Sequence, residues 1–357
     1  MTTIDDELER DRLNFFEQLL DVFYQAEKAV GGIDGFYNIA GYPVRLRFAG
    51  EAFIPFLTPG LVHLKAEPQT GVQLTVFLWD KLSTKVRLPL LIDSFLMSIK
   101  IGWSNVIDTR GELIGFNSDR WRMTFVPGSK ILTLFDRQRN LAIYYREDTS
   151  DIPYNERSAP LRSLFYWWLA DRDRQLVHAA AVGKASGGVL LAGKGGSGKS
   201  TSALACLHSE LNFLSDDYCV ISTNKKPHAY SLYNTAKLEG EADLQRFPHL
   251  VDRVSNRESL SFEKAILFID NPIVQFPIEA ILVPKVSGNK DTILYPIAPG
   301  RALFALAPTT LFQLPRSGNK ALQIMSSLVR QRPCYTLEVG TDLQQIPEVI
   351  DRLLDRL

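Results

Sequence analysis

The hydrophobic and polar positions give the first part of the chain two different textures. Apolar residues recur at helical spacing over residues 4–30 and acidic residues gather in the first turn, which predicts an amphipathic helix. Gly31-Gly32 is expected to end this helix. From residue 35 to about residue 145, short β-branched and aromatic runs alternate with glycine-containing turn signals. Strands are predicted at residues 42–48, 72–79, 121–126 and 130–136.

A polar, proline-bearing stretch at residues 147–160 is the predicted linker. It separates an amino-terminal helix plus β-rich domain at residues 1–150, whose function the sequence does not indicate, from a second domain at residues 160–357. The second domain opens with a predicted helix at 161–171, in which Trp167 and Trp168 favour core packing over stacking on a nucleobase.

The rest of the second domain alternates short apolar runs with helical patterns, which indicates an α/β fold. Strands are predicted at residues 175–183, 188–192, 211–214, 219–222, 260–269, 278–286 and 334–339, and helices at 302–307, 320–329 and 345–357.

Composition narrows the class of protein. The 357 residues carry 40 basic and 40 acidic side chains, so no net charge favours nucleic acid or an anionic membrane surface as a partner. No apolar run reaches the length of about 20 residues that a membrane-spanning helix needs. The polar, acidic start differs from a signal peptide, and three widely spaced cysteines indicate neither a disulfide framework nor a zinc cluster. A cytoplasmic protein is therefore expected.

The clearest chemical motif follows the predicted strand 188–192. Gly193, Gly198, Lys199 and Ser200 fill the fixed positions of the pattern G-x-x-x-x-G-K-[ST], and a helix-compatible run follows them. Glycines allow backbone amides to turn inward on a phosphate, which the positive end of the following helix also attracts. Lys199 is expected to neutralise the β and γ phosphates, and the Ser200 hydroxyl to ligate Mg²⁺. The predicted nucleotide-binding residues are Gly193, Lys194, Gly195, Gly196, Ser197, Gly198, Lys199, Ser200 and Thr201.

Two adjacent carboxylates, Asp216 and Asp217, follow the motif at the distance of one helix plus one strand. That distance returns the chain to the carboxyl end of a neighbouring strand, where ligands of open α/β sheets bind. One carboxylate can hold a metal while the other accepts the proton of an attacking hydroxyl. Neighbouring side chains of an extended strand point to opposite faces, so both reach one site only if the backbone turns there. His178, on the strand before the motif, can hydrogen-bond a phosphate or a carboxylate, or serve only the core.

The series of His178, the loop 193–200 and the pair Asp216-Asp217 resembles the catalytic domain of bacterial HPr kinase/phosphorylase, a relative of the phosphoenolpyruvate carboxykinases. The resemblance covers about residues 161–357 and is strongest over 177–220. It implies a carboxyl-terminal P-loop kinase domain of that type behind an unrelated β-rich (α+β) domain. It also implies that Lys199 and Ser200 bind ATP and Mg²⁺ and that Asp216 is the base toward a serine hydroxyl. Asp217 joins Ser200 at the metal, and His178 lies in the site.

The sequence departs from HPr kinases after the acidic pair. Residues 302–318 do not contain the glycine-rich signature that serves the protein substrate and the reverse phosphorolysis, which argues against HPr as the substrate. The tail from Pro333 to Gly340 looks more like HPr-kinase-related proteins of ribosomal-peptide tailoring, including lasso-peptide serine kinases. That likeness implies a hydroxyl of a peptide, protein or small molecule as the acceptor.

Three functions remain open at this stage. The first is an ATP- and Mg²⁺-dependent serine-type kinase in which Lys199, Asp216, Asp217 and His178 carry the catalysis. The second is a regulatory NTPase that hydrolyses ATP, and the third is a nucleotide-sensing binding module. No guanine signature N/T-K-x-D occurs, which disfavours a GTPase. Lys237 and Arg301 are weaker candidates for holding an anionic acceptor, and a homo-oligomer is a further possibility.

Overall fold

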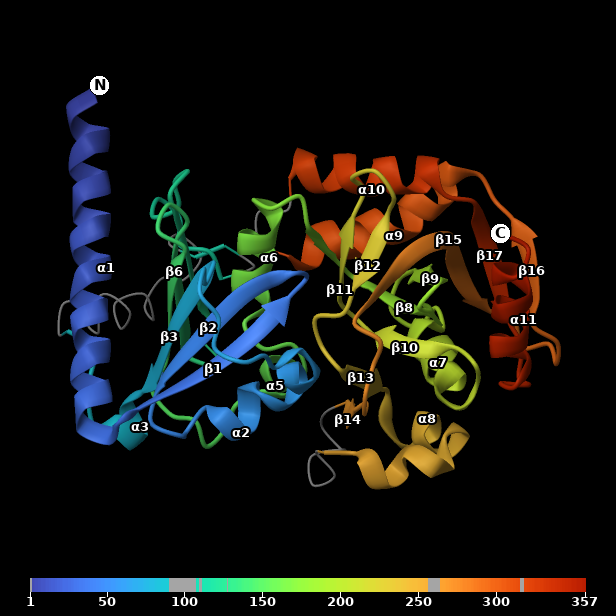
Figure 1. The fold of residues 1–357 in the computed structure, drawn as a ribbon, viewed down its shortest axis with the longest axis horizontal. Helices are drawn as coiled ribbons and strands as arrows, with labels where there is room; N and C mark the ends of the chain where they lie inside the picture. Colours follow the sequence, from blue (N-terminus) through green and yellow to red (C-terminus); the bar gives the residue numbers. More distant parts are fainter. Residues whose placement is uncertain (1, 90–106, 109–110, 127, 256–263, 315–317) are drawn as a thin grey trace. The chain divides into compact units, whose positions relative to one another are not determined.

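The computed structural model describes residues 2–89, 107–108, 111–126, 128–255, 264–314 and 318–357 (Figure 1). Residue contacts divide the chain into two units. The first contains Met1–Pro59 and Lys65–Pro153, and the second contains Gly60–Leu64 and Tyr154–Leu357. The architecture is mixed α/β with several sheets. No helix among the described residues is long and apolar enough to cross a membrane.

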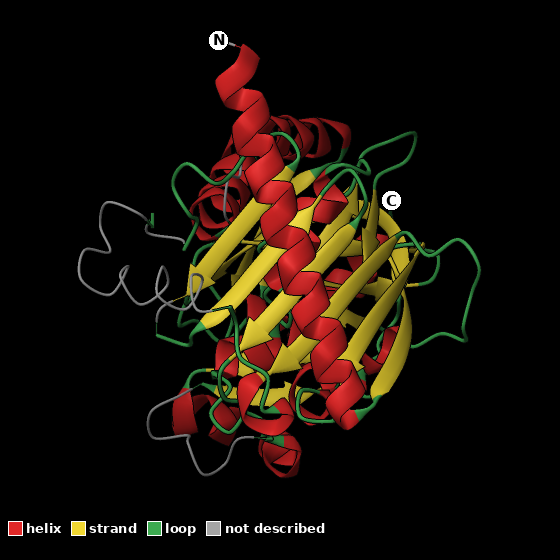
Figure 2. Ribbon diagram, turned by 90° about the vertical axis from the view of Figure 1, so that its left-hand side faces the viewer, coloured by secondary structure: helices red, strands yellow, loops and turns green. Residues whose placement is uncertain are grey.

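The first unit is a six-stranded mixed sheet with one long helix across it (Figure 2). The helix α1 (Thr2–Val30) buries Phe16, Leu19, Phe23 and Ala26, which recur at helical spacing and pack on the sheet around Trp79. The strand order is β1-β2-β3-β6-β5-β4. The strands are β1 (Gly32–Ile39), β2 (Tyr42–Ala49), β3 (Leu74–Asp80), β4 (Trp121–Val126), β5 (Ile131–Asp136) and β6 (Leu141–Arg146).

The predicted helix and four strands of the first unit are confirmed, with ends shifted by at most two residues. Two strands escaped prediction. The strand β1 begins directly after Gly31, whose φ of 86° ends α1, and β6 follows β5 through a tight turn. The short helices α2 (Ile54–Leu57) and α3 (Lys81–Thr84) also belong to this unit.

The second unit is built on a nine-stranded sheet with the path β10-β8-β9-β15-β12-β11-β7, to which β17 and β16 add beside β15. The strands are β7 (Gln175–Val177), β8 (Ala179–Lys184), β9 (Gly187–Ala192), β10 (Asn212–Ser215), β11 (Cys219–Ser222), β12 (His228–Tyr230), β15 (Gln275–Val286), β16 (Ile293–Pro296) and β17 (Cys334–Val339). A separate pair, β13 (Thr235–Leu238) and β14 (Ala265–Phe268), lies beside it.

Helices cover both faces of this sheet because its central strands are apolar on both sides. Along β9, Val189 and Leu191 join one buried cluster, while Leu190 and Ala192 join the other. The first cluster includes residues of α7 (Lys199–Ala205), α8 (Gly240–Arg246) and α11 (Gln345–Leu354), and the second includes residues of α9 (Pro299–Gln313) and α10 (Asn319–Gln331). The helix α6 (Arg162–Ala170) buries Trp167 and Trp168, as expected for core packing.

One predicted strand is wrong in a way that matters for the site. Residues 175–183 were expected to form one strand, but the chain breaks at His178, where the backbone N–H donates to Thr310 Oγ1 at 3.0 Å. On one side of the break β7 pairs with β11, and on the other β8 pairs with β9 and β10. His178 thus joins β7, at one end of the sheet path, to β8, the second strand from the other end, so the sheet must curl between them.

The strands β12, β13 and β16 and the helix α8 were not predicted, and several predicted elements differ in their ends. The strand predicted at 260–269 is β14, and residues 256–263 lie outside the described residues. The helix predicted at 302–307 is longer, because α9 continues through Pro308. The predicted linker 147–160 contains the short helix α5 (Tyr154–Ser158), whose five residues are too few to show a periodic apolar pattern.

A short segment of the amino-terminal half, Gly60–Leu64, packs within the second unit. It lies in the 3₁₀ helix η1 (Pro59–Leu64), where the His63 ring Nε2 and Ser231 Oγ are 2.8 Å apart. Gly60 accepts a hydrogen bond from the Asn234 backbone at 3.1 Å. Burial lowers the pKa of His63 to about 4 from 6.5.

This pKa predicts an acid-sensitive step in stability. Between pH 6.5 and about 4 the unfolded chain binds a proton at His63 that the folded chain does not, so the free energy of unfolding falls as the pH falls. We expect His63→Gln to reduce that fall by on the order of 2 kcal/mol between about pH 7 and about pH 5, measured by urea unfolding. The exposed His208→Gln serves as the matched control. An unchanged pH dependence in His63→Gln would exclude the buried neutral imidazole as its source.

Candidate active site

The glycine-rich loop lies between β9 and α7, so the motif has the strand, loop and helix order that the sequence indicated. Gly196 and Gly198 adopt positive φ of 73° and 102°, which residues with a Cβ rarely adopt. At Gly193 a Cβ would come within 2.5 Å of Ser197 Oγ, so a side chain there would have to displace the Ser197 side chain. The loop backbone itself requires glycine at Gly196 and Gly198.

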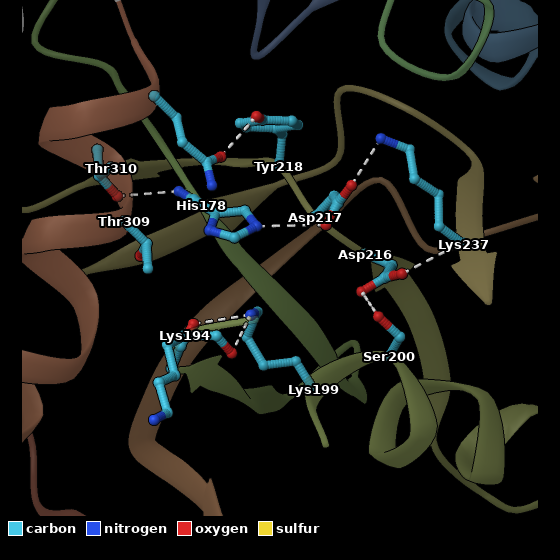
Figure 3. Close-up of polar contacts among 12 residues, drawn as sticks. His178, Lys194, Lys199, Ser200, Asp216, Asp217, Tyr218, Lys237, Thr309 and Thr310 are labelled. Atoms are coloured by element: carbon cyan, nitrogen blue, oxygen red, sulfur yellow. Dashed lines mark hydrogen bonds and ion pairs between the residues drawn. The ribbon is translucent and has the colours of Figure 1, made fainter. Parts of the chain in front are cut away.

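Lys199 is folded into this loop. Its side chain is 6% exposed, and Nζ donates to the carbonyl oxygens of Gly193 at 2.7 Å and Lys194 at 3.2 Å (Figure 3). Burial lowers the pKa of Lys199, against the opposing charges of Asp216 and Asp217. The ammonium group is thus held at the centre of the loop, whereas the Lys194 side chain is exposed.

The acidic pair sits at a break in the strand that faces His178. Between β10 and β11, Asp217 adopts a φ of 64°, and the Tyr218 N–H donates to the Asp216 carbonyl at 2.7 Å. This contact closes a γ-turn centred on Asp217. The backbone turn that both carboxylates need in order to serve one site is therefore present, and it is centred on Asp217.

Asp216 faces the loop helix. Its side chain is 1% exposed, Oδ1 accepts from Ser200 Oγ at 3.0 Å, and Oδ2 accepts from the Lys237 backbone N–H at 3.1 Å (Figure 3). Burial, followed by the charge of Asp217, raises the pKa of Asp216 to about 6. Among the residues that the structure describes, the carboxylate thus has hydrogen-bond donors but no cationic side chain in contact.

Asp217 points the other way, between a lysine and the histidine. Its Oδ2 lies 2.7 Å from Lys237 Nζ, and its Oδ1 lies 3.3 Å from His178 Nε2. Burial opposes its ionisation, but the Lys237 charge and the His178 contact outweigh that effect and lower the pKa of Asp217. Asp217 is therefore ionised at neutral pH.

His178 completes the group. Burial lowers its pKa despite the raising influence of Asp217, so the ring is neutral at pH 7. Its ring packs against Tyr218 with the centroids 5.5 Å apart. A neutral ring can donate from Nε2 to Asp217, which fixes the orientation of that carboxylate.

These side chains surround one polar cavity of about 390 Å³. The loop contributes Gly195, Gly196, Gly198, Lys199, Ser200 and Thr201 to its wall, and the facing wall includes His178, Asp217, Tyr218 and Lys237. Gly193 and Ser197 instead shape the loop from within. The structure thus gathers the predicted site residues around one space, with Asp216 buried behind Ser200.

Arg301, one of the two weaker candidates, has no place in the site. It is exposed in the first turn of α9 and is not among the residues that line the cavity. Lys237, by contrast, reaches Asp217 directly. The suggestion that Arg301 holds the acceptor is therefore not supported.

Sequence reasoning missed Arg162, Tyr218 and Gln313, which all line the cavity. Tyr218 directly follows the acidic pair. Arg162 is the only charged residue of α6, and a single cation in an otherwise apolar helix is a signal that could have been used. Gln313 lies at the end of α9, and its sequence context offers no comparable signal.

The donors beside the loop suit Mg²⁺. This cation prefers oxygen ligands, and proteins commonly supply only one or two of them because water and substrate phosphates complete the coordination. Ser200 Oγ and Asp216 Oδ1 are two adjacent oxygens, and a cation there would offset the burial of the Asp216 carboxylate. The described residues contain no cluster of three or more metal-binding side chains, so a metal held by protein groups alone is not indicated there.

Comparison with solved structures finds matches that include a distant likeness to a kinase/phosphatase. The HPr(Ser) kinase/phosphatase from Coxiella burnetii is 12% identical and aligns with a TM-score of 0.28, covering 51% of this chain and 97% of that chain. No protein-family model and no curated protein matches the sequence. The assignment of function therefore depends on the geometry of the site itself.

The loop geometry predicts which glycines tolerate a side chain. Gly198→Ala must hold a Cβ at a φ of 102°, so we expect it to lower the free energy of unfolding by about 1–3 kcal/mol. Gly195→Ala is the matched control, because its φ is ordinary and its Cβ would meet no atom within 4 Å. Thermal unfolding of both variants without nucleotide checks this. Equal stability of the two variants would contradict the positive-φ requirement.

Proposed function

We propose that the protein is an ATP- and Mg²⁺-dependent kinase that transfers the γ-phosphoryl group to a serine-type hydroxyl. The observation that carries the proposal is the division of the acidic pair: Asp216 bonds Ser200 of the loop, while the next residue, Asp217, faces the cavity. Phosphoryl transfer needs a group that secures the nucleotide and its metal and a group that receives the acceptor proton. In this site the consecutive residues Asp216 and Asp217 would supply these two groups.

The loop and Lys199 would hold the phosphates of ATP. Their backbone N–H groups and the Lys199 ammonium offer positive charge to the β and γ phosphates, and Ser200 and Asp216 would hold Mg²⁺. The cation supplies neutralisation of the charge that builds on the leaving phosphate oxygens. Because Lys199 already lies within the loop, little reorganisation is needed on binding.

Asp217 is placed to receive the proton. The acceptor oxygen forms a bond to the γ phosphorus as the bond from phosphorus to the β–γ bridging oxygen breaks, and ADP leaves with that electron pair. The acceptor proton passes to Asp217, which His178 and Lys237 orient from either side. The low basicity of Asp217 is tolerable because catalysis of this transfer is mainly alignment and charge stabilisation.

This division reverses the roles that the sequence resemblance implies, in which Asp216 is the base and Asp217 joins the metal. The reason is access. Asp216 is buried and does not line the cavity, whereas 26% of the Asp217 side chain is exposed there. A base must come within hydrogen-bond reach of the hydroxyl, so geometry favours Asp217 over the closer pKa match of Asp216.

The first test concerns the loop lysine. Lys199→Ala should weaken ATP binding by about 10-fold or more, the scale of a lost charged hydrogen bond, and should abolish transfer to any acceptor. Binding of labelled ATP and phosphate transfer to peptides, free serine and HPr are the measurements. Lys285→Ala, an exposed lysine of the same unit, is the control. Normal labelling of an acceptor by Lys199→Ala would contradict the kinase proposal. Release of inorganic phosphate by the unaltered protein, without a labelled acceptor, would favour an NTPase.

The second test separates the two carboxylates. Asp217→Asn should keep Mg²⁺-dependent ATP affinity but lower kcat by about 100-fold or more, the usual contribution of a general base. Asp216→Asn should instead raise the Mg²⁺ concentration needed for ATP binding. Equilibrium binding of ATP across a Mg²⁺ series, together with kcat, distinguishes them. The opposite pattern would return the role of base to Asp216.

A further inference from the structure

The cavity carries more positive than negative side chains. Two arginines and three lysines line it, against three carboxylates. Three of the cations lie within 4.0 Å of an acidic side chain, in the pairs Lys237–Asp217, Lys264–Glu239 and Arg246–Asp243. Lys199 bonds the carbonyls of the loop. Arg162 is the remaining cation: the Glu156 carboxylate influences its charge, but Arg162 forms no ion pair within 4.0 Å with an acidic side chain of the described residues.

Arg162 is nevertheless held firmly. Its guanidinium stacks over the Tyr218 ring, 5.1 Å from the centroid, and Nη1 donates to Tyr218 Oη at 2.8 Å. That hydroxyl in turn donates to Gln313 Oε1 at 2.8 Å. The tyrosine hydroxyl thus uses its donor, while the guanidinium has five N–H donors and this contact occupies one of them. Arg162 is a positioned cation with donors to spare.

The position of Arg162 relative to Asp216 and Asp217 indicates which part of a substrate it would contact. Asp216 contacts the loop through Ser200, Asp217 follows it, and Tyr218 contacts Arg162. In Figure 3 the Tyr218 ring and Lys199 lie on opposite sides of the contact between His178 and Asp217. The attacking hydroxyl must approach the γ phosphorus in line with the leaving oxygen, from the side away from the nucleotide. The body of the acceptor therefore extends toward Arg162.

We propose that Arg162 binds a carboxylate of the acceptor, so that the substrate is a hydroxyl compound with a carboxylate a few bonds from the hydroxyl. Lys199 is assigned to the phosphates of ATP, so Arg162 is the cation left for a single carboxylate of the acceptor, and its planar guanidinium suits the two carboxylate oxygens. This inference rests on the proposed kinase activity. A free hydroxy amino acid and a peptide that ends in serine both present this chemistry.

The test compares acceptors that differ only in the carboxylate. Serine, homoserine and a short peptide ending in serine are each supplied as the free acid and as the amide, with labelled ATP and Mg²⁺. We expect the acid of at least one pair to be preferred by about 10- to 150-fold in kcat/KM, the range of a hydrogen bond to a charged group. A preference for the acid of serine or homoserine would indicate a small-molecule acceptor. A preference for the acid of the peptide would indicate the carboxyl end of a peptide chain.

Substitutions of Arg162 test whether the preference for the acid depends on this side chain. Arg162→Gln should remove the preference by slowing the acid alone, and Arg162→Lys should restore part of it. Arg246 lines the same cavity but is paired with Asp243. Arg246→Gln should therefore leave the preference for the acid unchanged. Equal rates for acid and amide in the unaltered protein, or equal losses for both in Arg162→Gln, would overturn the proposal.

A binding measurement keeps this inference separate from the kinase assignment. Calorimetric titration with the same acids and amides, in the presence of Mg²⁺ and a non-hydrolysable ATP analogue, needs no turnover. Binding of an acid that depends on Arg162 supports the carboxylate site even if no acceptor is labelled. Absence of Arg162-dependent binding in a variant with an unchanged melting temperature would exclude it.

Discussion

The γ-turn at Asp217 is the constraint on which the site depends. In an extended strand, Asp216 and Tyr218 would share one face and Asp217 would occupy the other. The turn instead sends the three side chains to three partners around one space: Ser200, the pair His178 and Lys237, and Arg162. A left-handed residue that is not glycine costs on the order of 1–3 kcal/mol, so its contacts must hold it in place.

The facing strand makes room for that turn. The ribbon formed by β7 and β8 breaks at His178, opposite the break between β10 and β11, and each half pairs with a different neighbour. Thr310 of α9 takes the backbone donor that the interrupted ladder leaves at His178. The histidine is therefore structural and chemical at once, because the same break that curls the sheet brings its ring to Asp217.

The sequence predicted the motifs of the site better than the points at which the strands break or turn. The loop motif, the acidic pair and His178 were recognised because their residue types and spacing carry chemistry. The strand break was not, because Val177, His178 and Ala179 continue an apolar run that has no turn residue. The division of roles between Asp216 and Asp217 was also beyond reach, since it depends on which carboxylate the γ-turn leaves exposed. The contact of Arg162 with Tyr218 was missed because the two residues are distant in sequence.

The segment Gly60–Leu64 couples the two halves of the chain during synthesis. Its partners Ser231 and Asn234 emerge from the ribosome more than 160 residues later. Until those residues are synthesised, His63 has no partner with which to be buried. The second unit therefore cannot complete its packing from Tyr154–Leu357 alone. A chain begun at Tyr154 would lack this piece permanently, whereas a chain cut after Pro153 would carry it without a place to bind.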